Sequence, residues 1–261
     1  MSHIYIATLA ALIAGLTTIL GFFPLLFVKK LSKRSECICL SFAAGIMLAA
    51  SFFSLLNPSF EEASKLFSSN FIASFIVLLG FVLGVVFIGI VDRYLSSSDL
   101  EIFKKSEIDG KKNSSFIANM WVFVLAIIIH NFPEGMAVGV GFSTGDFELG
   151  IPIAIAIGLQ NVPEGLVVSV ACLAMGYSRK TAFLICLISG TVGLVGGFFG
   201  VLLVAFSKSL LPMGLSFAAG AMLFAIIDKM MFEIQNYKMQ NVASLSCITG
   251  LILMTILDRI F

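Results

Sequence analysis

The sequence predicts an all-α membrane protein that crosses the bilayer eight times, with its helices in a 3+2+3 inverted-repeat arrangement. Of its 261 residues, 59% are hydrophobic and only 12% are charged, and the mean hydropathy is +1.07. Its apolar residues form runs of about twenty, the length that spans the hydrocarbon core of a bilayer. Parts of the first runs also recur near the end of the chain. Because a soluble domain is nearer half apolar and a quarter charged, this composition excludes a soluble protein.

Eight stretches are long and apolar enough to be predicted as spans. They cover residues 4–28, 36–57, 70–92, 116–141, 150–175, 181–206, 211–233 and 242–258. The first is longer than the core of a signal peptide and has no basic residues before it, so we expect a transmembrane helix rather than a removed signal. The polar connection 93–115 mixes both charge signs and is predicted to be a solvated loop, so residues 1–261 form a single transmembrane domain.

The basic residues predict the orientation of the chain, because Lys and Arg are enriched in cytoplasmic loops. Twelve fall on alternate connections that include the 93–115 loop: Lys29, Lys30, Lys33, Arg34, Arg93, Lys104, Lys105, Lys111, Lys112, Arg179, Lys180 and Lys238. The opposite side holds Lys65, Lys208 and Arg259. We therefore expect a multi-pass protein of the cell (inner or plasma) membrane with both termini outside. The net charge of +1 gives no reason to expect a nucleic-acid partner.

An internal repeat relates the first spans to the later ones. Ser41–Leu48 (SFAAGIML) recurs as Ser216–Leu223 (SFAAGAML), and we call the displacement from Ser41 to Ser216 the repeat offset. The same offset pairs Gly15 with Gly190, Gly21 with Gly196, and Phe23 with Phe198. The predicted topology runs the two copies in opposite directions, which is the inverted repeat typical of secondary transporters. The alternative is that SFAAG is only a small-residue packing motif. The constant offset across two spans disfavours that alternative.

Two similar hexapeptides lie inside the fourth and fifth spans. The first is HNFPEG at residues 130–135, and the second is QNVPEG at residues 160–165. A charged side chain at a bilayer centre costs about 2.5–3.5 kcal/mol or more. A role beyond packing is therefore expected for Glu134 and Glu164.

The spacing of the polar residues predicts a cation site between these two spans. Residues i, i+3 and i+4 of a helix share one sector, and each hexapeptide places a carboxylate and amides, or an imidazole, at that spacing. These residues are His130, Asn131 and Glu134 on one helix and Gln160, Asn161 and Glu164 on the other. Pro133 and Pro163 each remove one backbone hydrogen bond near the same sector. Two carboxylates neutralise a divalent cation; oxygen donors suit Mg²⁺ or Mn²⁺, whereas the imidazole favours Zn²⁺, Fe²⁺ or Co²⁺.

Other interpretations of the chain remain at this point. The hexapeptides could form a polar clamp between kinked helices, which explains the amides but explains two acids poorly. His130 and Glu134 at i, i+4 also resemble part of an intramembrane metal-dependent hydrolase, although no H-E-x-x-H occurs. A passive cation channel is the third alternative, and saturable against linear uptake separates it from a transporter. Cys37 and Cys39 could bind a soft metal, but their place at a helix start favours a structural role.

The paired hexapeptides resemble the signature of the ZIP (Zrt/Irt-like protein) metal transporters, in particular the bacterial branch. The resemblance covers essentially the whole chain, including eight spans, outside termini and SFAAG-ML in the second and seventh spans. It implies transport of a divalent metal, zinc first and also iron, manganese, cobalt or cadmium, into the cytoplasm. It implies no permanent cofactor and no enzymatic activity. Whether the chain forms a homodimer stays open.

The resemblance also implies roles for individual residues. The main transport site would consist of His130, Glu134, Gln160, Asn161 and Glu164, with a thioether from Met47. Asn131 would line a second, adjacent site, with Glu134 and Glu164 as bridges.

This sequence departs from the family pattern at three positions. Many relatives carry a glutamate where Gly193 stands, which favours a single bound cation here. Lys229, beside Asp228, stands where relatives often have an acid, and is expected to pair with Asp228 or Glu233 or to occupy space near the path. Gln160 stands where some relatives have His, which leaves the metal less defined.

Overall fold

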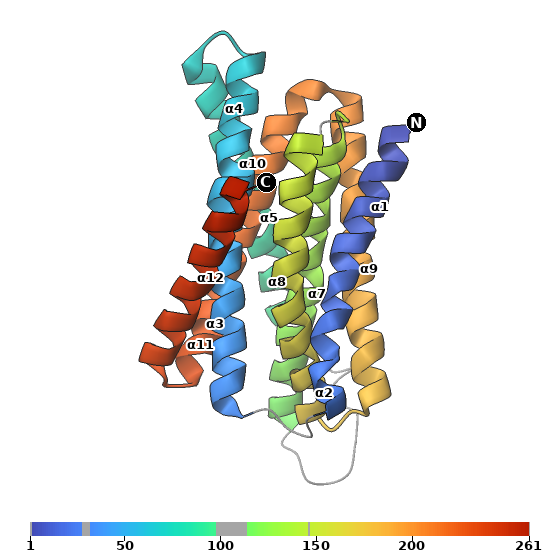
Figure 1. Cartoon of the computed structure of the whole chain (residues 1–261), viewed down its shortest axis with the longest axis vertical. Coiled ribbons are helices and arrows are strands. Elements are labelled where there is room, and N and C mark those ends of the chain that lie inside the picture. The colour runs from blue at the N-terminus through green and yellow to red at the C-terminus, as the bar shows by residue number, and fades with distance from the viewer. Residues whose placement is uncertain (1, 28–31, 98–113, 146, 261) are drawn as a thin grey trace.

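The computed structural model describes residues 2–27, 32–97, 114–145 and 147–260, and every regular element in those ranges is a helix (Figure 1). The elements are α1 Ser2–Leu16, η1 Thr17–Phe22, α2 Pro24–Phe27, α3 Lys33–Ala49, η2 Ala50–Leu56, α4 Asn57–Leu66, α5 Asn70–Ser97, α7 Ser114–Phe142, α8 Phe147–Ala174, α9 Arg179–Phe206, η3 Lys208–Leu210, α10 Leu211–Ala225, η4 Ile226–Met230, α11 Met231–Asn236 and α12 Gln240–Ile260. The all-helical prediction is confirmed for the described residues.

Seven helical segments of the described chain are long and apolar enough to cross a membrane. They are Ile4–Phe27, Lys33–Leu66, Asn70–Val91, Phe147–Leu173, Arg179–Phe206, Lys208–Asn236 and Gln240–Ile260. They correspond to seven of the eight predicted spans. The remaining prediction, 116–141, falls on α7, a helix of 29 residues that is not among the seven. Most of the predicted loop 93–115 lies outside the described residues.

The first predicted span is not one regular α-helix. After α1 the chain tightens into the 3₁₀ segment η1 and resumes as the short α2. Gly21 lies in backbone contact with α8, where a side-chain carbon would collide with the carbonyl of Val162. Thr17 donates a hydrogen bond from Oγ1 to the Gly158 carbonyl of the same helix, at 2.7 Å. Close packing against α8 therefore accompanies the tighter winding.

The second and seventh spans share an irregular winding. α3 passes into the π-helical segment η2, and α10 passes into the π-helical segment η4, in each case just after the SFAAG repeat. The second span then continues as α4 to Leu66, well past its predicted end at residue 57. Pro58 does not stop it because proline is tolerated in the first turn of a helix. The seventh ends at Asn236, shortly before Lys238 adopts a left-handed backbone with φ 55°.

The helices fall into two groups that meet along the middle of the molecule. α1, α7, α8 and α9 pack on one another, while α3 packs on α12 and α5 packs on α10. The contacts of α3 with α8 and of α10 with α7 join the groups. Figure 1 shows the first group on the right and the second on the left, with both ends of the chain in the upper half of the molecule.

Glycines set the close helix contacts, and one partner of each contact recurs at the repeat offset. A side-chain carbon at Gly165 would collide with the Thr18 carbonyl, and one at Gly135 would collide with the carbonyl of Gly193, the repeat counterpart of Thr18. In the other group, Gly45 contacts Cys247 as its repeat counterpart Gly220 contacts Phe81. Phe42 likewise contacts Gly250 as its counterpart Phe217 contacts Gly84, whereas the partners on α12 and α5 are related by a different displacement. Gly15 and Gly190 touch each other. The two copies of the repeat therefore contact their neighbours through equivalent positions.

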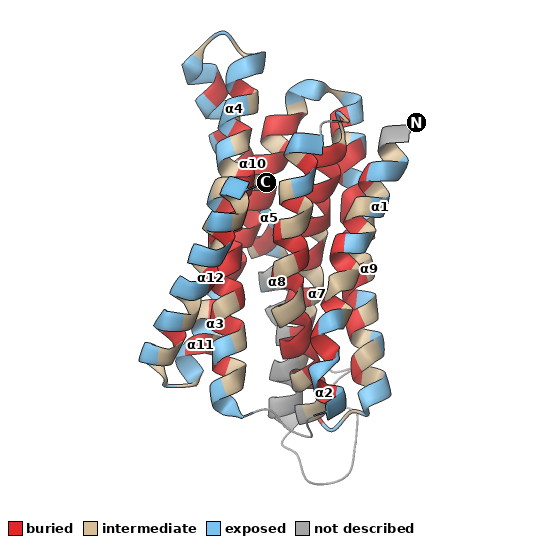
Figure 2. Ribbon diagram, in the orientation of Figure 1, coloured by how far each residue is buried: buried red, intermediate tan, exposed pale blue. Residues whose placement is uncertain are grey.

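Burial follows this arrangement (Figure 2). The inner faces of α3, α7, α8 and α10 are buried, whereas α5 and α12 expose large apolar side chains such as Phe71, Ile90 and Ile252. Apolar residues that face outward around a bundle match a lipid environment, where they meet hydrocarbon instead of water. A polar side chain inside this bundle is then the feature that needs an explanation.

Candidate metal site

The two hexapeptides lie on neighbouring helices at the centre of the molecule. α7 carries residues 130–135 and α8 carries residues 160–165, and each helix continues through its proline. All six predicted polar residues of the hexapeptides are buried: His130, Asn131, Glu134, Gln160, Asn161 and Glu164. Gly135 and Gly165 let α9 and η1 approach, as their lack of a side chain allows. The polar sectors are thus enclosed by protein.

A hydrogen bond joins the two hexapeptides. Gln160 donates from Nε2 to Oε1 of Glu134 at 2.6 Å, and the two side chains are 0% and 1% exposed. Glu164 is also buried, and its carboxylate interacts electrostatically with that of Glu134. Two buried carboxylates that interact in this way repel each other when both are charged, so the arrangement favours a bound cation.

Both asparagine amides are held by their nitrogen atoms. Asn131 donates from Nδ2 to the Ser189 hydroxyl at 2.8 Å and to the Ile127 carbonyl at 3.3 Å. Asn161 donates from Nδ2 to the Ala14 carbonyl at 3.1 Å. Because an amide has one donor end and one acceptor end, these bonds fix where each oxygen points.

Five buried oxygens on the two helices have no hydrogen-bond partner among the described residues. They are Asn131 Oδ1, Glu134 Oε2, Gln160 Oε1, Asn161 Oδ1 and Glu164 Oε1. A buried acceptor without a partner costs about 1–3 kcal/mol, so five within two hexapeptides are not explained by packing. Oxygen lone pairs without donors are what a cation would satisfy. The polar-clamp interpretation accounts for the hydrogen bond between Gln160 and Glu134, but it leaves these five unpartnered acceptors unexplained.

The donor set is mixed. In the described part of the chain, no three side chains from His, Cys, Asp and Glu stand together closely enough to hold a metal ion. A cation between α7 and α8 would therefore need amide oxygens in addition to the carboxylates. His130 is buried one turn before Glu134 on α7, but the structure does not bring it together with both carboxylates at metal-binding range.

Met47, predicted through the family resemblance, lies buried on α3. This helix packs against α8, the helix that carries the second hexapeptide. The participation of the Met47 thioether stays a prediction. Lys229 pairs with Asp228, with Nζ and Oδ2 3.3 Å apart, which is one of the two partners expected for it.

Three hydrogen-bonding neighbours of the candidate site were missed from the sequence. Ser189 and the Ala14 carbonyl hold the two asparagines, and Thr17 bonds both Ala14 and Gly158 through its hydroxyl. The repeat offset contained a usable signal, because it pairs Ala14 with Ser189.

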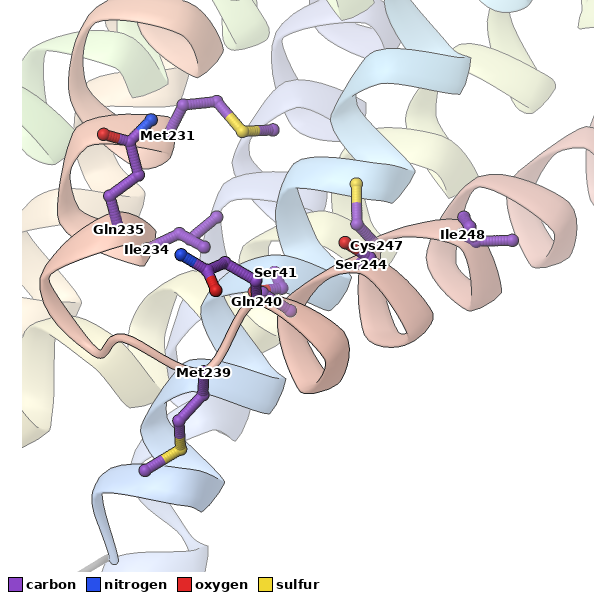
Figure 3. A pocket seen from close by; sticks show the side chains of 10 residues that line it. Ser41, Met231, Ile234, Gln235, Met239, Gln240, Ser244, Cys247 and Ile248 are labelled. Atoms are coloured by element: carbon purple, nitrogen blue, oxygen red, sulfur yellow. The ribbon is translucent and has the colours of Figure 1, made fainter.

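A separate pocket of about 360 Å³ lies between α3, α11 and α12 (Figure 3). Its lining is Ser41, Met231, Ile234, Gln235, Met239, Gln240, Ala243, Ser244, Cys247 and Ile248. It contains no carboxylate and none of the hexapeptide residues. This pocket is therefore distinct from the candidate metal site.

Known proteins resemble the chain over most of its length. The family described as ZIP zinc transporter matches residues 97–258. Zinc transporter GufA of Myxococcus xanthus is 36% identical over 249 residues, which cover 95% of this chain and 96% of the relative. Zinc transporter ZIPB of Bordetella bronchiseptica is 35% identical over 98% of this chain and 81% of the relative. Human zinc transporter ZIP11 is 32% identical over 84% of this chain and 86% of the relative.

Proposed function

The chain belongs to the ZIP family of zinc transporters, and from this we propose that it carries a divalent transition-metal cation into the cytoplasm through a site between α7 and α8. The members it resembles are transporters and not enzymes, so the hydrolase alternative is set aside. The cation is the transported substrate, and no permanent cofactor is proposed.

The single observation that carries the proposal is the set of five unpartnered buried oxygens around two carboxylates. Such a set is unfavourable when empty, because the carboxylates repel and the amide oxygens are desolvated. A divalent ion removes both penalties, since two carboxylates balance its charge. A site that is costly when empty and neutral when filled can bind a cation without holding it irreversibly, because water and protons can replace the cation on release.

We propose zinc as the leading substrate, with iron, manganese, cobalt and cadmium as candidates. The carboxylate and amide oxygens alone suit harder ions. The imidazole of His130 and the thioether of Met47 shift the preference toward softer transition metals. The relatives named above are all called zinc transporters, which supports zinc as the leading substrate.

The proposed ligands of the main site are His130, Glu134, Gln160, Asn161 and Glu164, with Met47. We also include Asn131, which precedes Glu134 by less than one turn on α7, among the residues that surround the cation. We propose that one cation binds at a time, because Gly193 adds no donor where α9 faces α7. This part of the proposal is supported by the backbone contact of Gly193 with Gly135.

We further propose that α7 is the eighth span and that the helices form a 3+2+3 inverted repeat. The recurrence of glycine contacts at the repeat offset, and of π-helical segments after each SFAAG, supports this arrangement. The two groups of helices would then be the units that move against each other during transport.

The proposed orientation places both termini outside. The C-terminal ends of α4 and α12, which carry Lys65 and Arg259, and the connection from α9 to α10, which carries Lys208, lie toward the end of the bundle that also holds the termini (Figure 1). Lys33, Arg34, Arg179 and Lys180 lie at the opposite end, which the excess of basic residues marks as cytoplasmic. The cation would enter from the end that holds the termini.

Uptake into proteoliposomes tests the proposal. Purified protein is reconstituted, and radiolabelled Zn²⁺ uptake is measured against external concentration, with Fe²⁺, Mn²⁺ and Cd²⁺ as competitors. We expect saturable uptake that is lost in His130→Ala/Glu134→Ala and retained in Glu61→Gln, an exposed carboxylate on α4. Linear uptake would indicate a channel, and uptake unchanged in the double variant would refute the site.

A further inference from the structure

The two asparagines of the site are anchored at equivalent positions of the internal repeat. Asn161 donates its amide hydrogen to Ala14 on α1, and Asn131 donates its own to Ser189 on α9. Ala14 and Ser189 are separated by the repeat offset, the same displacement that relates the two SFAAG segments. The anchors therefore correspond in position and differ in chemistry.

The difference in chemistry gives Asn131 an anchor that depends on a side chain. The Ala14 carbonyl can only accept, so it holds the nitrogen end of Asn161 whatever residue stands at position 14. The Ser189 hydroxyl can accept or donate, and removing it leaves Asn131 with only the longer bond to Ile127 at 3.3 Å. The Ser189 hydroxyl is thus the closer of the two acceptors that direct the Asn131 amide, and the one that a substitution can remove.

Ser189 is held firmly relative to α7. Its side chain is fully buried, and Gly190 beside it lies in backbone contact with Gly15. One turn further along α9, Gly193 lies in backbone contact with Gly135. A rigidly placed acceptor orients its donor with little freedom, which is what a preorganised ligand needs.

We propose that Ser189 is a positioning residue for the transported cation. By binding the nitrogen of Asn131, it turns Oδ1 of that amide, which is buried and unpartnered, toward the cation beside Glu134. Ser189 itself does not touch the cation. The inference rests on the proposed function, because it assigns Asn131 a ligand role in that site.

A double-mutant cycle in the full-length protein tests this assignment. Zn²⁺ uptake is measured in proteoliposomes for wild type, Ser189→Ala, Asn131→Ala and the combined variant, and Zn²⁺ binding to the same proteins in detergent is measured by calorimetry. We expect Ser189→Ala to raise the half-saturating and dissociation constants roughly three- to tenfold, the size of one hydrogen bond to a ligand, with the maximal rate within twofold of wild type.

The decisive comparison is the Asn131→Ala background, where removing the Ser189 hydroxyl should have no further effect. Ser189→Thr, which keeps the hydroxyl, should stay close to wild type. The matched control is Ser216→Ala, a buried serine whose hydroxyl donates to the Met213 carbonyl of its own helix.

Three outcomes would overturn the inference. The first is a half-saturating Zn²⁺ concentration in Ser189→Ala equal to that of wild type. The second is an equal loss of Zn²⁺ affinity on removing the hydroxyl from wild type and from Asn131→Ala. The third is a Ser189→Ala protein that loses only maximal uptake rate. If Ser189→Ala does not assemble, Ser189→Cys takes its place in the cycle, because sulfur is only a weak acceptor. Failure of the proposed function appears separately, as an absence of saturable uptake by the wild type.

Discussion

Gln160 on α8 and Glu134 on α7 share a hydrogen bond of 2.6 Å that crosses between the two hexapeptides. The bond uses the nitrogen end of Gln160 and one oxygen of Glu134. It leaves Gln160 Oε1 and Glu134 Oε2 without partners, both buried. One amide therefore orients a carboxylate and contributes a donor oxygen of its own.

Gln160→Leu should weaken zinc binding because it removes one donor oxygen and frees the Glu134 carboxylate. We expect the half-saturating Zn²⁺ concentration for uptake to rise roughly tenfold, equivalent to about 1.4 kcal/mol. Gln235→Leu is the matched control, since Gln235 is exposed on α11 and lies outside the site. Wild-type half-saturation in Gln160→Leu would remove this residue from the ligand set.

Glu134→Gln should distinguish two effects on stability: the repulsion between the carboxylates without a cation, and the stabilisation of the protein by a bound cation. The substitution keeps the shape of the side chain and removes one of two buried, repelling charges, so the metal-free protein should unfold at a higher temperature in detergent. Zinc at 100 times its Kd should stabilise the wild type by about 2.7 kcal/mol, and this shift should be lost in the variant. Glu61→Gln should keep the zinc shift. A Glu134→Gln protein that zinc still stabilises fully would contradict the charge-balance argument.

Gly190→Ala should destabilise the protein, because the new methyl group would collide with the backbone carbonyl of Gly15. Backbone atoms cannot move aside as a flexible side chain does, so we expect a loss of roughly 1–3 kcal/mol or more, measured as a lower unfolding midpoint in detergent. Gly89→Ala is the control. Its nearest new neighbour would be the Phe224 ring at 3.5 Å, an ordinary contact, so stability should be kept or slightly raised. Equal midpoints for the two variants would argue against close contact between α1 and α9.

The sequence predicted the helices better than their winding. Hydropathy locates apolar stretches, and each predicted stretch contains a helix in the described residues. The 3₁₀ turn at Thr17–Phe22 and the π segments after SFAAG were missed, since they accompany contacts such as that of Gly21 with α8. Those contacts join residues far apart in the chain, and a local pattern does not contain them.

The residues of the candidate site could be predicted from the sequence, but the orientation of their amide side chains could not. Helical spacing placed the six polar side chains in two sectors, and the structure buries all six. Which end of each amide faces inward depends on Ser189 and on the Ala14 carbonyl, neither of which belongs to a hexapeptide. Only the repeat offset linked those two positions in advance.

Gly193→Glu should change the number of cations bound, because it adds a third carboxylate beside the Asn131 side of the site. Space for the first side-chain atom exists: it would lie 3.6 Å from the Ala11 carbonyl oxygen and 3.7 Å from that of Asn131. We expect wild type and Gly193→Ala to bind one Zn²⁺ per chain and Gly193→Glu to bind two, since the added charge can balance part of a second ion. Equilibrium dialysis with metal analysis gives these counts directly. Two ions in the wild type would show that Asn131, Glu134 and Glu164 already hold a second cation without a donor from α9.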